Sequence, residues 1–123
     1  MAQASSDSST VAALRVLVAD DSKALRQRAR TMLERAGLTV VDEAADGAEA
    51  VSMAAAHQPD VVLLDPRMPR GDGLEVAQAL RRQQPGMQVV LWDWDGAQLD
   101  RAARRSGAQA AVPKDIRAAE LVA

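Results

Sequence analysis

Short apolar runs alternate along the chain with longer segments whose apolar residues recur at helical spacing. The runs are rich in Val, Leu and Ala and are too short for helices, which is typical of strands. Five strands are predicted, at Leu14–Ala19, Thr39–Ala44, Val61–Leu64, Gln88–Leu91 and Ala110–Val112. Because several runs are apolar without strict alternation, we expect a sheet that is covered on both faces.

The segments between these runs are predicted to be helices. In Ser22–Ala36 the apolar residues fall on one stripe, and Gly37 follows as a helix cap. The other expected helices begin or end beside Gly, Pro or Asp, at Ala48–His57, Gly73–Gln84, Gln98–Ser106 and Ile116–Val122. The alternation predicts a (βα)5 fold of the α/β class, a doubly wound parallel sheet, because each return crossover has to be long and right-handed.

The composition is that of one globular domain with an aliphatic core. Of the 123 residues 48% are hydrophobic, but only 2% are aromatic, and both aromatic residues are Trp. A net charge of -2 gives no general attraction to nucleic acid or to a membrane, and the absence of Cys excludes disulfides and thiolate chemistry. With no signal peptide and no apolar run of about 18 residues, we expect a cytoplasmic domain over residues 13–123 and a disordered tail over residues 1–12.

Charged residues gather where the predicted strands end. Asp20 and Asp21 follow the first strand, Asp65 follows the third, and Lys114 follows the fifth by two positions. Ligands of such sheets bind beyond the carboxyl ends of the strands. Three neighbouring carboxylates stay ionised only if positive charge compensates them, and a divalent cation would add two charges to that of Lys114. A set of oxygen ligands favours Mg²⁺ or Mn²⁺ over zinc.

These residues, taken in order, resemble the response-regulator receiver (CheY-like) family. The motifs that carry the resemblance are Asp20-Asp21, Leu64-Asp65-Pro66-Arg67-Met68-Pro69, Gly71-Asp72-Gly73-Leu74-Glu75 and Lys114. The resemblance covers about residues 14–122 and implies a flavodoxin-like sheet with strand order 2-1-3-4-5. Lys114-Asp115 and Glu120-Leu121-Val122 are similar to the NarL/FixJ subfamily, whose receivers usually carry a DNA-binding output domain; such a domain would lie outside this chain.

The resemblance also implies roles for single residues. Asp65 would accept a phosphoryl group from a histidine kinase or phosphotransfer protein, so that the chain is a regulatory phosphoacceptor and not an enzyme. Asp20, Asp21, Asp65 and the backbone carbonyl of Arg67 would hold Mg²⁺ or Mn²⁺, and Lys114 would pair with the phosphoryl oxygens. The implied partners are the phosphodonor and an output domain or effector protein; a homodimer is also compatible.

Three positions depart from the family pattern. Trp92 stands where the family has Ser or Thr, Asp93 stands where a small residue is usual, and Ala111 replaces the aromatic residue of the fifth strand. An indole offers one N–H donor in place of a hydroxyl, and a carboxylate after it would repel an incoming dianion. We therefore predict an atypical switch, in which Trp92 keeps one fixed inward or outward pose.

Other interpretations stay open at this point. A pseudo-receiver, which binds a partner without phosphorylation, is the main alternative. Asp20 and Asp21 could simply be acids of a first helical turn, and Trp92 and Trp94 could be core residues or an interface anchor. A flavin carrier is disfavoured because no Gly-rich phosphate cradle follows the first strand, and an aspartyl phosphatase is disfavoured because Arg67 stands where it needs a second acid.

Overall fold

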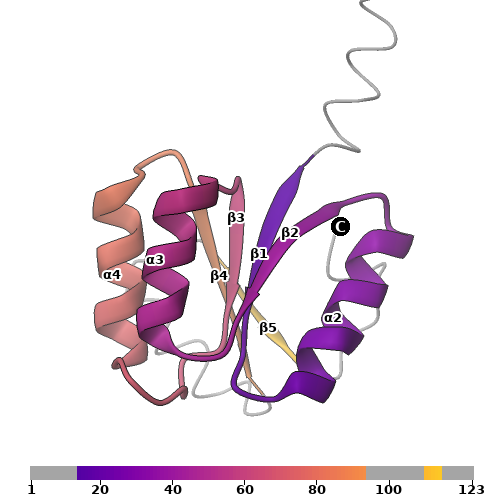
Figure 1. Cartoon of the computed structure of the whole chain (residues 1–123), viewed down its shortest axis with the longest axis horizontal. Helices are drawn as coiled ribbons and strands as arrows, with labels where there is room; N and C mark the ends of the chain where they lie inside the picture. The colour runs from indigo at the N-terminus through magenta and orange to yellow at the C-terminus, as the bar shows by residue number, and fades with distance from the viewer. Residues whose placement is uncertain (1–13, 94–109, 115–123) are drawn as a thin grey trace, which may run out of the picture.

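The computed structural model describes residues 14–93 and 110–114, and the other residues are drawn in grey in Figure 1. The tail predicted over residues 1–12 and the helices predicted at Gln98–Ser106 and Ile116–Val122 lie outside the described residues. No helix in the described ranges is both long and apolar enough to cross a membrane.

The centre of the fold is a parallel sheet in the order β2-β1-β3-β4-β5. The parallel α/β architecture and the strand order agree with the sequence prediction. The order reverses between β1 and β3, so the carboxyl ends of these two strands form the switch point at which ligands of such sheets bind. The strands are β1 (Arg15–Ala19), β2 (Thr39–Ala44), β3 (Val61–Leu64), β4 (Gln88–Asp93) and β5 (Ala110–Pro113).

Helices cover both faces of this sheet (Figure 1). Helix α2 (Lys23–Arg35) lies on one face, while α3 (Gly47–His57) and α4 (Gly73–Gln83) lie side by side on the other. The hydroxyl of Ser22 caps α2 by accepting a hydrogen bond from the backbone N–H of Leu25 at 3.2 Å. The helix ends before Gly37, whose φ of 94° is in the left-handed region that glycine tolerates.

Two apolar layers form the core, because successive strand residues point to opposite faces. The layer under α2 contains Val16, Val18, Ala29, Leu33, Val40, Leu63 and Trp92. The layer under α3 and α4 is built from small helix residues against strand residues, among them Ala50, Ala54, Ala77, Leu17, Leu64, Val89 and Leu91. Among the described residues, the core is aliphatic apart from Trp92, as the composition predicts.

Two strand ends differ from the prediction. Trp92 and Asp93 do not follow β4 but are its last two residues, paired with Val112 and Pro113 of β5. Lys114 accordingly follows β5 directly and not by two positions. The pairing with β5 extends both strands, and apolar periodicity contains no information on such a partner.

Candidate functional site

Asp20, Asp65 and Lys114 meet at the switch point, at the carboxyl ends of β1, β3 and β5. The Nζ of Lys114 lies 2.7 Å from Oδ2 of Asp20 and 3.0 Å from Oδ2 of Asp65. The three side chains are almost entirely buried. Lys114 therefore bridges two buried acids from neighbouring strands.

Asp21 completes the group, which we call the acidic site: Asp20, Asp21, Asp65 and Lys114. The three acids each offer an oxygen, and these atoms lie within 4.8 Å of one another. Asp21 is exposed. Three carboxylates against one ammonium leave an excess of two negative charges, and oxygen atoms are the donors that Mg²⁺ and Mn²⁺ prefer. The residues present thus fit a divalent cation.

Backbone hydrogen bonds orient both buried acids. Oδ1 of Asp20 accepts from the N–H of Ser22 at 2.9 Å, and Oδ1 of Asp65 accepts from the N–H of Arg67 at 2.8 Å. Each is a local turn in which the carboxylate bonds the backbone two residues further on. One oxygen of each acid is held by its own loop, while the other faces Lys114.

Burial and close charges change the pKa values of two residues in the acidic site, Asp20 and Lys114. It raises the pKa of Asp20 above its ordinary value, and the hydrogen bond and charge of Lys114 only partly oppose this shift. Burial alone would lower the pKa of Lys114, but its hydrogen bonds and charge contacts with Asp20 and Asp65 outweigh burial and raise it. The ammonium is therefore firmly charged, and the negative charge around it is incompletely compensated.

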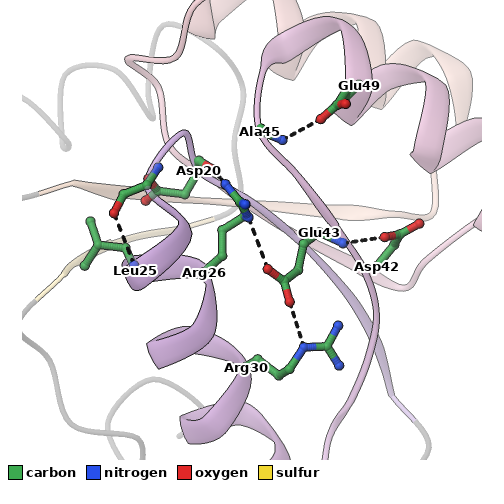
Figure 2. Close-up of polar contacts among 9 residues, drawn as sticks. Asp20, Leu25, Arg26, Arg30, Asp42, Glu43, Ala45 and Glu49 are labelled. Carbon is green, nitrogen blue, oxygen red and sulfur yellow. Dashed lines mark hydrogen bonds and ion pairs between the residues drawn. The ribbon is translucent and has the colours of Figure 1, made fainter.

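A second layer of charged residues holds the first loop of the site (Figure 2). Nη1 of Arg26 donates to the backbone carbonyl of Asp20 at 2.8 Å, and its Nε donates to Oε1 of Glu43 at 3.1 Å. Nε of Arg30 donates to Oε2 of Glu43 at 2.8 Å. Burial would raise the pKa of Glu43, but the hydrogen bonds from Arg30 and Arg26 outweigh it and lower the pKa. Sequence reasoning missed this network, although the spacing of Arg26 and Arg30 puts them on one helix face.

Trp92 lies in the core beneath α2 and is only 1% exposed. The Nζ of Lys114 is 5.3 Å from the centroid of its ring, a cation–π distance. Within the described part of the chain its Nε1–H has no hydrogen-bond partner. Of the poses left open by the sequence, the structure has the inward one, so Trp92 is a core residue and not a surface anchor. Trp94 lies outside the described residues.

Asp93 is buried as well, but it is paired with a cation that the sequence prediction did not include. Its Oδ1 lies 2.6 Å from Nη2 of Arg67, whose side chain is 57% exposed. The backbone carbonyl of Asp93 accepts a hydrogen bond from the N–H of Lys114 at 3.0 Å. Ala111 is in β5, where its backbone pairs with Leu91 of β4.

The loop that follows Asp65 is held from two helices. The N–H groups of Gly47 and Ala48, in the first turn of α3, donate to the carbonyls of Pro69 and Arg70 at 3.2 and 3.0 Å. At the start of α4, a Cβ on Gly73 would lie 2.7 Å from Cα of Pro66 and closer still to its carbonyl oxygen. Only glycine fits this approach, which fixes the backbone next to Asp65.

Comparison with known proteins is consistent with this geometry. The sequence profile of the response regulator receiver domain matches residues 16–123. The transcriptional regulatory protein PdtaR of Mycobacterium tuberculosis is 37% identical over 108 residues, which are 88% of this chain and 53% of that protein. The chain thus spans about half the length of this relative.

Two solved structures are similar over most of the chain. The signal receiver domain of NarL from Mycobacterium tuberculosis superposes with a TM-score of 0.80 at 37% identity, covering 89% of this chain and 90% of that one. A complex of CheX, CheY, BeF3 and Mg²⁺ from Borrelia burgdorferi has a TM-score of 0.81 at 28% identity, with coverages of 89% and 84%.

Proposed function

Because the chain belongs to the response regulator receiver domain family, we propose that it is a phosphoacceptor of a two-component signalling system and that Asp65 receives the phosphoryl group. The observation that carries the proposal is the bridge from Lys114 to Asp20 and Asp65 beside the exposed Asp21. Such a site combines a carboxylate nucleophile with a fixed positive charge.

The proposed reaction moves the phosphoryl group from a phosphohistidine of a partner kinase or phosphotransfer protein to Asp65. A carboxylate oxygen of Asp65 bonds to phosphorus, the P–N bond breaks, and the imidazole nitrogen leaves with the electron pair. A carboxylate is a weak nucleophile, so the rate depends on holding the donor in line and balancing its charge. Lys114 is proposed to move from Oδ2 of Asp65 to the oxygens of the phosphoryl group.

A divalent cation, Mg²⁺ or Mn²⁺, is proposed to be held by Asp20, Asp21, Asp65 and the backbone carbonyl of Arg67. When bound, it supplies positive charge to the phosphoryl oxygens. The oxygen atoms of the three acids within 4.8 Å support this assignment, as does the similarity to the CheY complex that contains BeF3 and Mg²⁺.

The output of the domain is proposed to lie elsewhere. PdtaR is a transcriptional regulatory protein of which this chain matches about half, so we propose that residues 13–123 form the receiver and that a DNA-binding domain or another effector responds to it. In this proposal the receiver itself contacts neither nucleic acid nor membrane and works in the cytoplasm.

The test is labelling with acetyl phosphate and Mg²⁺, followed by intact mass. We expect one added phosphoryl group, lost in Asp65→Asn. Asp60→Asn is the matched control, because Asp60 directly precedes β3 whereas Asp65 directly follows it. The carboxylate of Asp60 accepts a hydrogen bond from the N–H of Arg15 at the opposite end of the strands. Labelling that survives Asp65→Asn would refute the assignment of the nucleophile.

A pseudo-receiver, which binds its partner without phosphorylation, is the second candidate. The observation in its favour is the buried indole of Trp92 where the family has a hydroxyl. This candidate predicts no adduct in the natural chain with or without Mg²⁺, and partner binding that Asp65→Asn does not alter. An adduct that does not form at Asp65 would contradict both candidates.

A further inference from the structure

The ion pair between Arg67 and Asp93 lies directly beside the proposed phosphoacceptor. Leu64 of β3 pairs with Leu91 of β4, so Asp65 is level with Trp92 and Asp93 is one residue further along the neighbouring strand. The N–H of Arg67 is bonded to Asp65 at 2.8 Å, and the carbonyl of Asp93 is bonded to the N–H of Lys114 at 3.0 Å. Each member of the pair is thus tied by its backbone to a residue of the acidic site.

The two partners differ in how far they can move. Asp93 is 3% exposed and belongs to a paired strand, whereas the side chain of Arg67 is 57% exposed and extends from a loop. A buried carboxylate needs a nearby cation, which accounts for the 2.6 Å contact with the guanidinium. The arginine, however, can rotate about its side-chain bonds to another anion within reach.

A phosphoryl group on Asp65 would be such an anion. It carries about two negative charges and three acceptor oxygens, and the planar guanidinium bonds oxygens of this kind with paired donors. Asp93 and the phosphoryl group would therefore compete for the same cation, whereas the ammonium of Lys114 already lies on Asp65.

We propose that Arg67 is a phosphoryl-binding residue that exchanges its contact with Asp93 for the phosphoryl oxygens on Asp65 when Asp65 is phosphorylated. This inference rests on the proposed function. The exchange withdraws the guanidinium from the end of β4 when the phosphoryl group arrives, and so links the acidic site to β4 without the hydroxyl that Trp92 replaces. Asp93 sets the threshold, because it holds Arg67 until a stronger anion is present.

The test is a double-mutant cycle on the rate of labelling by acetyl phosphate and Mg²⁺, with Arg67→Gln, Asp93→Asn and the double variant. We expect Arg67→Gln to slow labelling about tenfold, the effect of one charge-assisted hydrogen bond. Asp93→Asn is expected to speed labelling about tenfold while Arg67 is present and by less than about twofold in its absence. Arg70→Gln is the control, since it removes the same charge from the same loop at a side chain that is 79% exposed.

The labelling rates distinguish failure of the exchange from failure of the proposed function. If Asp93→Asn speeds labelling by the same factor in both backgrounds, Asp93 acts only by its charge, and the exchange is refuted while the proposed function stands. If none of the proteins is labelled, the proposed function fails, and this inference fails with it. Labelling that appears only in Asp93→Asn would leave the natural chain without an adduct, and so would refute both the proposed function and the exchange.

A measurement on the natural chain avoids reliance on the variants. The NMR signal of the Arg67 Nε–H group, assigned with Arg67→Lys, is expected to shift when beryllofluoride and Mg²⁺ are added, and that of Arg70 is expected to stay. A beryllofluoride complex that leaves the Arg67 signal in place would refute the exchange.

Discussion

Replacing Lys114 by Met removes the ammonium that bridges the two buried acids and keeps an unbranched side chain against the face of Trp92. The contacts at 2.7 and 3.0 Å correspond to about 6 kcal/mol of Coulomb attraction each at an effective dielectric of about 20. This figure is an upper bound, because desolvation of the ammonium opposes it. What remains after the substitution is a pair of buried carboxylates, with 0% and 4% exposure.

In the Lys114→Met variant, we expect one of the two buried acids to take up a proton, which removes the repulsion between them. At pH 7 this protonation costs about 4 kcal/mol, roughly three pH units above the ordinary pKa of Asp at about 1.36 kcal/mol per unit. At pH 5 the same protonation costs only about 1.5 kcal/mol. We therefore expect Lys114→Met to lower the free energy of unfolding by about 4 kcal/mol at pH 7 and by about 1.5 kcal/mol at pH 5, a large share of the total for a small domain.

Urea unfolding at the two pH values measures this directly. A divalent cation would replace the missing charge, so about 10 mM Mg²⁺ should stabilise the variant by about 1.4 kcal/mol if the variant binds it with a Kd near 1 mM. The natural chain, in which Lys114 already supplies a positive charge, should be stabilised less. Lys23→Met, at the exposed start of α2, is the control and should change little. A second substitution, Asp20→Asn, should restore part of the loss by removing one of the two charges.

The reasoning is refuted if Lys114→Met loses less than about 1 kcal/mol at pH 7 without Mg²⁺, which is the range of an exposed pair. A loss of equal size at pH 5 and pH 7 would also refute it, because a proton could not then be the compensating charge.

Three further predictions concern the residues that support the acidic site. Arg26→Met should lower the free energy of unfolding by about 1–2 kcal/mol and weaken Mg²⁺ binding, since the carbonyl of Asp20 loses its hydrogen-bond donor. Arg28→Met, at an exposed position of the same helix, is the control. An equal effect of the two substitutions would contradict the reasoning. Glu43→Gln should destabilise the domain by about 1 kcal/mol at pH 7, and this difference should vanish in acid. The pKa of Glu43 is lowered in the folded chain. The stability that its carboxylate contributes is therefore present above the unfolded pKa of about 4.3 and is lost as the pH falls through the folded pKa. A difference in urea unfolding that does not decrease as the pH falls below the unfolded pKa of about 4.3 would contradict the pKa assignment. Gly73→Ala should destabilise the chain by about 2 kcal/mol and weaken Mg²⁺ binding, because its Cβ would displace Pro66 next to Asp65; Gly86→Ala, where a Cβ would meet nothing within 4 Å, should do neither.

The sheet and the gathering of charges were predictable because both depend on chain order. Short apolar runs separated by helical segments allow few arrangements, and parallel strands bring their carboxyl ends to one edge. Asp20, Asp65 and Lys114 therefore had to approach one another if the strands were correctly identified. The ends of α2 agree with the prediction within one residue, since Ser22 and Gly37 mark them in the sequence.

The side-chain partners were not predictable in the same way. Arg67 reaches Asp93 from a loop, and Arg26 reaches the carbonyl of Asp20 from a helix. Both contacts depend on how a loop or a helix is placed against a strand, and the periodicity of apolar residues contains no information on that placement. The position of Trp92 and Asp93 inside β4 was missed for a related reason, because pairing with β5 sets the end of that strand.

The hydrogen bonds from α3 to Pro69 and Arg70, with the approach of Gly73 to Pro66, determine where the chain tolerates insertions. Extra residues between Pro66 and Gly73 would break contacts on both sides, so the length of that segment is fixed by the helices around it. At the other end of β4, the turn containing Gly86 has open space around it. A tag or fluorophore inserted there would be separated from the acidic site by the length of the strand, about 20 Å, and would leave the site undisturbed.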